Sequence, residues 1–181
     1  MRLSFKYRFE AAHRFVHSDH ACATPHGHTW YATLNLMGAT EDMGENNMVE
    51  DFFLLKKDWK QFIMETVDHS FFHNSDDPIL PALKQHIPNL RSLPFPGDPT
   101  TEVIAGLFFL KATALCESLP VRPFSVLIEE TPTNSIEFYN TELEDFISKL
   151  NLSLKSSNWW ANNDPTSRSI FGDPQPQSAN L

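Results

Sequence analysis

The segment LSFKYRFEAAHRFVHSDHACATPHGHTWYATLNLM, residues 3–37, decides the fold. Its first part alternates apolar and polar side chains from Leu3 to Glu10, which is the period of a strand with one buried and one exposed face. A second alternation runs from Gly27 to Met37 and puts Trp30 on the apolar face. The segment therefore predicts two strands joined by a loop that carries four histidines and a cysteine.

Downstream of this segment the chain predicts two helices. Apolar side chains at helical spacing follow Asp51, a good N-cap residue, as far as Val67. Asp98 and Pro99 have the pattern of an N-cap and a first-turn proline, so they predict a second helix that ends near Ser118.

The remaining elements complete a ββααββ order with one terminal helix. Residues 74–99 are rich in Pro, Asp and Asn and predict a long irregular connection, with a short helix near residues 80–85. Alternating positions predict a third strand over residues 124–130 and a fourth over residues 135–139. Thr141 and Glu144 have capping-box spacing ahead of the terminal helix. This order of elements predicts the α+β class.

Length and composition favour a single domain. A chain of 181 residues with 41% hydrophobic residues can bury one core. We place the domain at residues 1–152. Residues 153–181 are mostly Asn, Ser, Asp, Pro and Gln and predict a polar, flexible C-terminal tail. Trp159 and Trp160 are the exceptions, and they are expected to hold part of the tail against the domain.

Charge and cysteine content restrict the partners and the compartment. The net charge of -9 argues against nucleic acid and against anionic membranes, and no apolar run is long enough to span a bilayer. Cys22 and Cys116 are too few for a disulfide framework, and residues 1–6 lack an apolar signal core. We expect a cytoplasmic protein.

His26 and His28 are the first candidates for a metal site. Two residues apart on an extended segment, they project to the same side and can bind one ion, with His13 as a third ligand. Three imidazoles and an open fourth position are typical of catalytic zinc. A lone His-x-His is more often without metal, and His17 and His20 are competing ligands or simply exposed loop residues.

Cys22 is a candidate base or nucleophile. A single thiol is more often a small buried apolar residue, which is the interpretation we favour for Cys116 in its apolar helix. Cys22 has no strand or helix pattern around it into which it could pack. A nearby divalent cation would favour the reactive thiolate.

Two acidic motifs are ambiguous by themselves. Asp68 and His69 follow a predicted helix and could be no more than its C-terminal cap. Glu129 and Glu130 could be a solvated pair, yet Glu130 shares a strand face with Ile128 and needs a partner there.

Taken together, these motifs resemble the 6-pyruvoyl-tetrahydropterin synthase and 6-carboxytetrahydropterin synthase family over roughly residues 5–139. The resemblance rests on their order along the chain. The motifs are Glu10-Ala11-Ala12-His13, Cys22-x-x-x-His26-Gly27-His28, Val49-Glu50-Asp51-Phe52, Asp68-His69, Pro99-Thr100-Thr101-Glu102 and Glu130-Thr131.

The resemblance implies a role for each motif. The zinc (Zn²⁺) ligands would be His13, His26 and His28. Cys22 would be the general base, and Asp68 and His69 would relay its proton. Glu130 would anchor the pterin ring, with Thr100, Thr101 and Glu102 shaping the pocket.

The resemblance also implies a reaction and an assembly. The family has the tunnelling fold, an antiparallel sheet with two helices on one face, and three subunits close a β-barrel. Two trimers then stack as a homohexamer. The substrate would be a pterin triphosphate, 7,8-dihydroneopterin triphosphate, and the enzyme a lyase.

The spacing from Cys22 to His26 and Thr29 after His28 resemble the branch that forms 6-carboxy-5,6,7,8-tetrahydropterin, a queuosine and 7-deazapurine precursor. Alternatives are the 6-pyruvoyl branch, which eliminates triphosphate, a non-catalytic zinc- or pterin-binding protein, and an oxygenase with two histidines and a carboxylate. The long connection, His73-Asn74 after the Asp-His pair and the segment after Thr141 depart from the family pattern.

Overall fold

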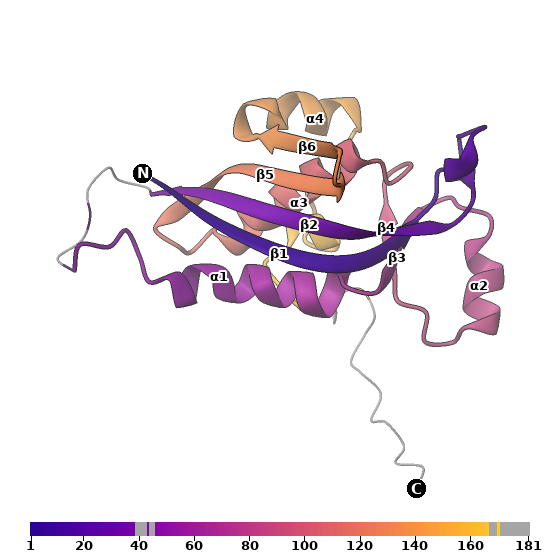
Figure 1. Cartoon of the computed structure of the whole chain (residues 1–181), viewed down its shortest axis with the longest axis horizontal. Coiled ribbons are helices and arrows are strands. Elements are labelled where there is room, and N and C mark those ends of the chain that lie inside the picture. The colour runs from indigo at the N-terminus through magenta and orange to yellow at the C-terminus, as the bar shows by residue number, and fades with distance from the viewer. Residues whose placement is uncertain (39–42, 44–45, 167–169, 171–181) are drawn as a thin grey trace, which may run out of the picture.

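The chain folds around a curled six-stranded sheet, seen in the computed structural model of residues 1–38, 43, 46–166 and 170 (Figure 1). The strand order is β4-β3-β1-β2-β5-β6. The strands are β1 (Arg2–His13), β2 (His26–Gly38), β3 (Ser70–Asn74), β4 (Ser92–Phe95), β5 (Val121–Thr131) and β6 (Asn134–Tyr139). The helices are α1 (Phe52–Gln61), α2 (Leu80–His86), α3 (Thr101–Leu115) and α4 (Leu143–Lys149).

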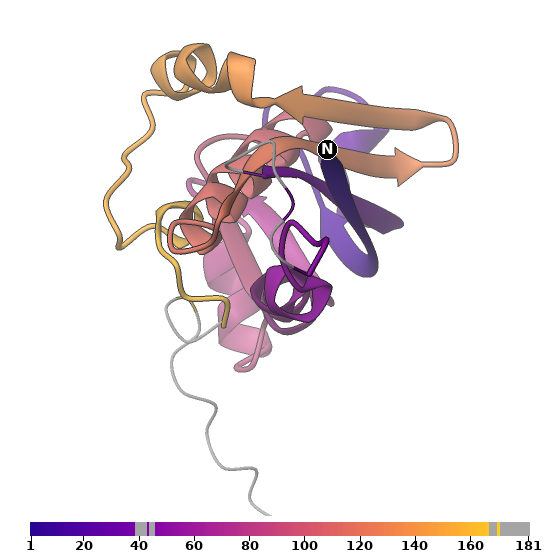
Figure 2. The ribbon, with the colours of Figure 1, turned by 90° about the vertical axis from the view of Figure 1, so that its left-hand side faces the viewer.

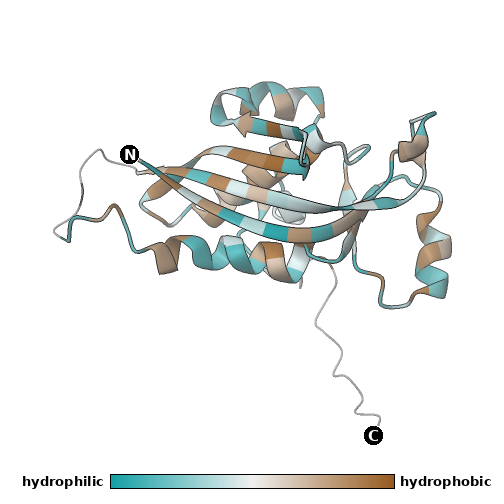
Figure 3. Cartoon of the chain, in the orientation of Figure 1, coloured by the Kyte–Doolittle hydropathy of each residue, from teal (hydrophilic) through white to brown (hydrophobic). Residues whose placement is uncertain are grey.

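The β1–β2 hairpin confirms the two strands predicted from residues 3–37. The strands pair in antiparallel register from Arg2↔Met37 to His13↔His26. Figure 3 shows hydrophilic and hydrophobic residues alternating along β1. Phe9 and Trp30 are opposite one another, and their stacked rings are 6.1 Å apart in the core. The β2–β5 and β5–β6 pairs are also antiparallel, as expected.

Two helices cover one face of the sheet, as the fold class requires (Figure 2). Asp51 caps α1 by accepting a hydrogen bond from the backbone N–H of Phe53, as predicted. The predicted helix then continues to Val67 as a π-helical segment, Phe62–Val67. The Trp59 ring of α1 is 6.1 Å from the Phe108 ring of α3, so the two helices share one aromatic core.

The expectation of an irregular connection over residues 74–99 is wrong in part. The short helix α2 is present, but β4 lies within the connection. The sequence analysis also missed β3, which comes just before the connection and runs parallel to both β1 and β4. All five residues of β3 are buried, so its sequence SFFHN has no alternating pattern to reveal it. β4 contains Pro94, which the sheet tolerates because β4 is an edge strand.

Two predicted helix starts are also wrong. α3 begins at Thr101 with Thr100 as its N-cap, because the carboxylate of Asp98 binds elsewhere. The capping pattern of Thr141 and Glu144 is not used. Instead Glu142 accepts a hydrogen bond from the backbone N–H of Tyr139 at 2.8 Å, and α4 begins at Leu143.

The described part of the C-terminal segment packs against α3. Trp159 is buried, and its indole N–H donates to the Pro94 carbonyl at 2.8 Å. Trp160 is buried as well. The ammonium group of Lys111, itself buried in α3, donates to the backbone and side-chain oxygens of Asn162 at 2.8 Å each. Most of the tail beyond residue 166, which we expected to be flexible, lies outside the described residues.

Among the described residues, none of the helices has both the length and the apolar character needed to cross a bilayer.

Candidate active site and metal centre

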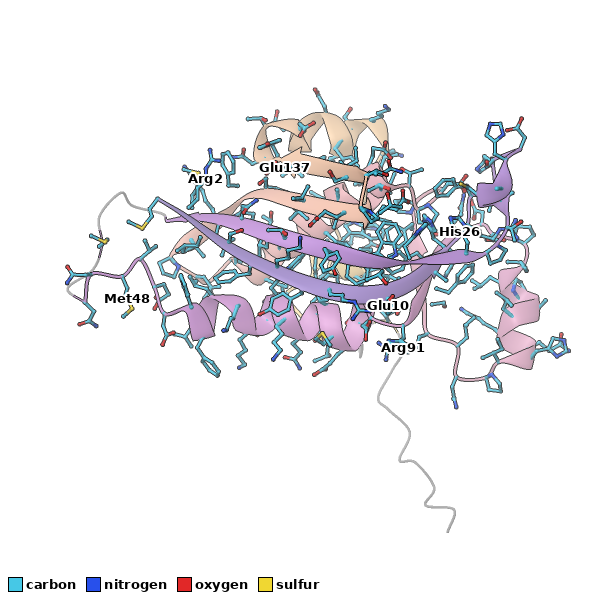
Figure 4. All side chains as sticks on the ribbon, in the orientation of Figure 1. Arg2, Glu10, His26, Met48, Arg91 and Glu137 are labelled. Atoms are coloured by element: carbon cyan, nitrogen blue, oxygen red, sulfur yellow. The ribbon has the colours of Figure 1, made fainter. Side chains whose placement is uncertain are left out.

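Three histidines meet on the helix-covered face of the β1–β2 hairpin. His13 and His26 are directly opposite in the register, and His28 faces Ala11 two residues further along the same face. One ring nitrogen from each histidine lies within 4.8 Å of the others. A Cβ at Gly27 would lie 3.3 Å from the Ala11 carbonyl, so glycine suits this close approach of the strands. Figure 4 labels His26 at this end of β2.

Hydrogen bonds fix the orientation of two of these rings. Nδ1 of His13 is 3.0 Å from the Pro99 carbonyl, and Nδ1 of His26 is 2.8 Å from the Thr24 carbonyl. A carbonyl only accepts, so both Nδ1 atoms carry the proton and both Nε2 atoms present lone pairs. These two Nε2 atoms are 3.1 Å apart. Two lone pairs at this distance repel unless a cation lies between them.

Burial favours the neutral form of His13 and His28. It lowers the pKa of His13 to about 4 and outweighs the hydrogen bond to Pro99, which raises it. Burial also lowers the pKa of His28. Neutral imidazole is the form that binds metals.

The donor set fits a zinc ion. Zn–N bonds of about 2.0–2.1 Å at tetrahedral angles place ligand nitrogens about 3.3 Å apart, close to the 3.1 Å between His13 and His26. The competing candidates are elsewhere. The side chain of His17 is 78% exposed beside Asp98, and that of His20 is 83% exposed beside Asp19. The three histidines on the hairpin could therefore hold a metal ion.

Glu130 lies beside this cluster. Its Oε1 is 3.7 Å from Nε2 of His13, and its side chain is 18% exposed. Glu130 follows Val126 and Ile128 on the buried face of β5 at the alternating positions of the strand, and the register of β5 against β6 shifts between Glu129 and Thr131. Glu129, by contrast, is paired with Lys6 at 2.6 Å. Strand alternation thus separates the two adjacent carboxylates, one at the cluster and one in a surface ion pair.

Cys22 lies in the loop between β1 and β2, within the 3-10 turn Ala21–Ala23. The residue is partly buried, and its carbonyl accepts a hydrogen bond from the backbone N–H of Phe15 at 2.9 Å. This bond draws the two sides of the loop together. The loop begins directly after His13 and ends at His26, so its two ends are two of the clustered histidines.

Asp68 and His69 form an oriented pair. Nδ1 of His69 is 2.8 Å from one oxygen of Asp68, and the other oxygen accepts a hydrogen bond from the Glu10 backbone at 2.8 Å. The φ angle of His69 is 59°, a strained value for a residue other than glycine and typical of functional positions. The hydrogen bonds that link the pair to other described residues go to Glu10 and to the Ile63 carbonyl, and none goes to Cys22.

The His69 side chain opens into a hollow of about 570 Å³. This volume is in the range of small-molecule sites. Its lining includes His28 and Glu10 of the β1–β2 hairpin, together with Phe71, Leu90 and Arg91. Figure 4 labels Glu10 and Arg91 at this edge of the sheet. Phe71, Leu90 and Arg91 were missed by the sequence analysis because they belong to β3 and to the connection expected to be irregular.

Residues 99–102 join α3 to the cluster. Besides the carbonyl of Pro99, which binds His13, the Thr100 hydroxyl accepts a hydrogen bond from the N–H of Val103 at 3.4 Å. Thr101 is the first residue of α3, and Glu102 is exposed in its first turn. The residues that we expected to shape a pocket, Thr100, Thr101 and Glu102, therefore directly follow a residue that contacts a candidate metal ligand.

Comparison with known proteins points to the same family that the sequence motifs resemble. The family model described as 6-pyruvoyl tetrahydropterin synthase matches residues 2–141. The 6-carboxy-5,6,7,8-tetrahydropterin synthase of Aquifex aeolicus is 29% identical over 158 residues, covering 75% of this chain and 96% of that protein. The Haemophilus influenzae protein of the same name is 29% identical over 141 residues, covering 76% and 97%.

Solved structures show the same fold. The 6-pyruvoyl tetrahydropterin synthase of Caenorhabditis elegans has a TM-score of 0.55 and 25% identity, covering 77% of this chain and 95% of that one. An uncharacterised protein from Wolinella succinogenes has a TM-score of 0.67 and 23% identity, covering 77% and 98%. The matches span nearly all of these proteins but leave about a quarter of this chain outside.

Proposed function

The chain belongs to the 6-pyruvoyl tetrahydropterin synthase family, and we propose that it is a zinc-dependent lyase that forms 6-carboxy-5,6,7,8-tetrahydropterin from 7,8-dihydroneopterin triphosphate. The observation that carries the proposal is the group of three histidines with two inward lone pairs and the Glu130 carboxylate beside them. The names of the relatives from Aquifex aeolicus and Haemophilus influenzae support the 6-carboxy product.

The proposed reaction balances with one water molecule. The bond between the first and second side-chain carbons breaks, the first carbon becomes the carboxylate, and the other two leave as acetaldehyde. The triphosphate leaves from the third carbon. The ring gains the hydrogens that convert a dihydropterin into a tetrahydropterin, so no external oxidant or reductant is needed.

Each residue has a proposed task. Zinc held by the three histidines would act as a Lewis acid that makes side-chain protons of the substrate more acidic. The Cys22 thiolate takes a proton, and the Asp68–His69 pair, whose Nδ1–H is held by the carboxylate, exchanges it through Nε2 of the imidazole. The Glu130 carboxylate accepts hydrogen bonds from the ring N–H and the amino group. Residues 100–102 shape the pocket.

The product test decides between the two branches of the family. Incubation with 7,8-dihydroneopterin triphosphate should give 6-carboxytetrahydropterin and acetaldehyde in equal amounts, because one carbon-carbon bond breaks per turnover. Mass spectrometry of the pterin and an enzymatic assay of acetaldehyde measure both. A pyruvoyl product without acetaldehyde would place the chain with the 6-pyruvoyl branch, which the likeness to the Caenorhabditis elegans structure keeps as the alternative.

We further propose a homohexamer, a dimer of trimers, whose active sites combine residues of neighbouring subunits. Asp68 and His69 are bound to β1 at Glu10, whereas Cys22 is in the loop beyond the end of that strand. The pair would then exchange a proton with the Cys22 thiol of a neighbouring subunit.

Mixing two inactive variants tests this arrangement. Subunits with Cys22→Ala and subunits with His69→Ala should regain activity after being unfolded and refolded together, because some sites then combine an intact thiol with an intact histidine. About a quarter of the sites would be intact in a random equal mixture, since each of two positions is wild type half of the time. A mixture as inactive as its parents, or a fully active monomer, would contradict the proposal.

A further inference from the structure

The Asp98 carboxylate joins three separate segments of the chain. One oxygen accepts hydrogen bonds from the backbone N–H of Val16 at 2.9 Å and from the side-chain amide of Asn74 at 3.0 Å. The other accepts from the backbone N–H of His17 at 2.9 Å. The loop after β1, the end of β3 and the segment before α3 therefore meet at this one side chain.

These bonds hold the loop that carries Cys22. Val16 and His17 are on the outgoing side of the loop, and the neighbouring Phe15 binds the carbonyl of Cys22 at 2.9 Å. The position of the thiol thus depends on a chain of bonds that begins at Asp98. The next residue, Pro99, holds the His13 ring through its carbonyl. One dipeptide therefore fixes both the Cys22 loop and a candidate metal ligand.

Asp98 is not required for beginning the helix that follows it. Thr100 is the N-cap of α3, and its hydroxyl accepts the N–H of Val103. Asn74 is itself oriented, because its side-chain oxygen accepts the N–H of Asp76 at 3.0 Å while its amide group donates to Asp98. The carboxylate is thus held by the oriented amide of Asn74 and by the backbone N–H groups of the loop.

The carboxylate is suited to this task as an anion. Burial raises the pKa of Asp98, but hydrogen bonds from His17, Asn74 and Val16 outweigh it, and the pKa lies below the ordinary value. Hydrogen bonds to an ionised acceptor are stronger than those between neutral groups.

We propose that Asp98 is a positioning residue that sets the place of the Cys22 thiol relative to the three-histidine cluster. It acts on the rate of the chemical step and not on metal or pterin binding. This inference rests on the proposed function, since it gives Asp98 a role in that reaction.

Substitutions at Asp98 should lower kcat at an unchanged KM. Asp98→Ala removes all three hydrogen bonds and is expected to lower kcat about 100-fold, the cost of displacing a catalytic group by about 1 Å. Asp98→Asn replaces one oxygen by an NH₂ group that meets a backbone N–H, so kcat should fall less than in Asp98→Ala. Zinc content should stay at that of the wild type in both. Asp19→Ala is the matched control, because this acidic side chain of the same loop is 90% exposed.

Amide hydrogen exchange gives a readout that does not depend on turnover. The N–H groups of Val16 and His17 should exchange at least about tenfold faster in Asp98→Ala and at the wild-type rate in Asp19→Ala. If the wild type does not convert the pterin, the proposed function fails while the exchange result still stands.

Two results would overturn the inference. One is an unchanged kcat in Asp98→Ala, whether or not the N–H groups of Val16 and His17 exchange faster. The other is loss of zinc together with activity, which would make Asp98 part of the metal site's structural support. Should Asp98→Ala fail to fold, Asn74→Ala removes one donor to the same carboxylate and carries the same test, with a smaller fall in kcat expected.

Discussion

Replacing Cys22 with alanine is expected to abolish turnover while leaving zinc and pterin bound. A positioned general base contributes about 10²–10⁴-fold to the rate, so kcat should fall by at least 100-fold. The thiol is not part of the three-histidine cluster, so the metal should stay. Steady-state kinetics, metal analysis by mass spectrometry and pterin fluorescence titration measure the three quantities separately.

The second cysteine is the matched control. Cys116 is buried at the end of α3, and burial raises its pKa to about 12, so its thiol stays protonated and inert. Cys116→Ala should keep kcat and lower only the stability. Zinc lost together with the Cys22 thiol would mean that Cys22 is a ligand, and unchanged turnover would remove it from the mechanism.

Replacing His28 with alanine is expected to empty the metal site. Two histidines hold a divalent ion far less tightly than three, because two of the four coordination positions of the ion would then lack a protein ligand. The fold should survive, because His28 is only partly buried whereas His13 is fully buried among aromatic rings. Metal analysis after dialysis should find zinc near one per chain in the wild type and near zero in the variant, with turnover lost in parallel.

His20, an exposed histidine of the loop between β1 and β2, provides the control for this experiment. His20→Ala should keep full zinc and full activity, because the His20 side chain is 83% exposed and pairs with Asp19. Circular dichroism should show the same secondary structure in both variants. Full zinc occupancy in His28→Ala would contradict the assignment of the ligands.

The sequence predicted those parts of the fold that have a regular period. Residues of β1 and β2 alternate because one face of this hairpin is buried and the other is not, and two histidines two residues apart on a strand must share a face. The helix after Asp51 was likewise visible from its cap and its apolar spacing. The grouping of His13 with His26 and His28 was therefore predictable as a possible metal site.

The features that were missed depend on contacts between distant segments. β3 is buried along its whole length and so has no alternation, and the register shift of β5 against β6 between Glu129 and Thr131 has no local signal. Asp98 resembles a helix cap in the sequence, but backbone groups of the loop far earlier in the chain compete for its carboxylate and bind it. The positive φ of His69, whose backbone N–H donates to the Glu10 carbonyl, could not be read from residue types.

Zinc dependence of turnover is the most direct test of the central claim. The protein is purified without added metal, stripped with a chelator and reloaded with zinc, and each form is given 7,8-dihydroneopterin triphosphate. We predict one zinc per chain as purified, loss of 6-carboxytetrahydropterin and acetaldehyde formation in the stripped form, and recovery of both with one equivalent of zinc. Undiminished turnover in the stripped protein, or iron as the metal found in the purified protein, would contradict the account.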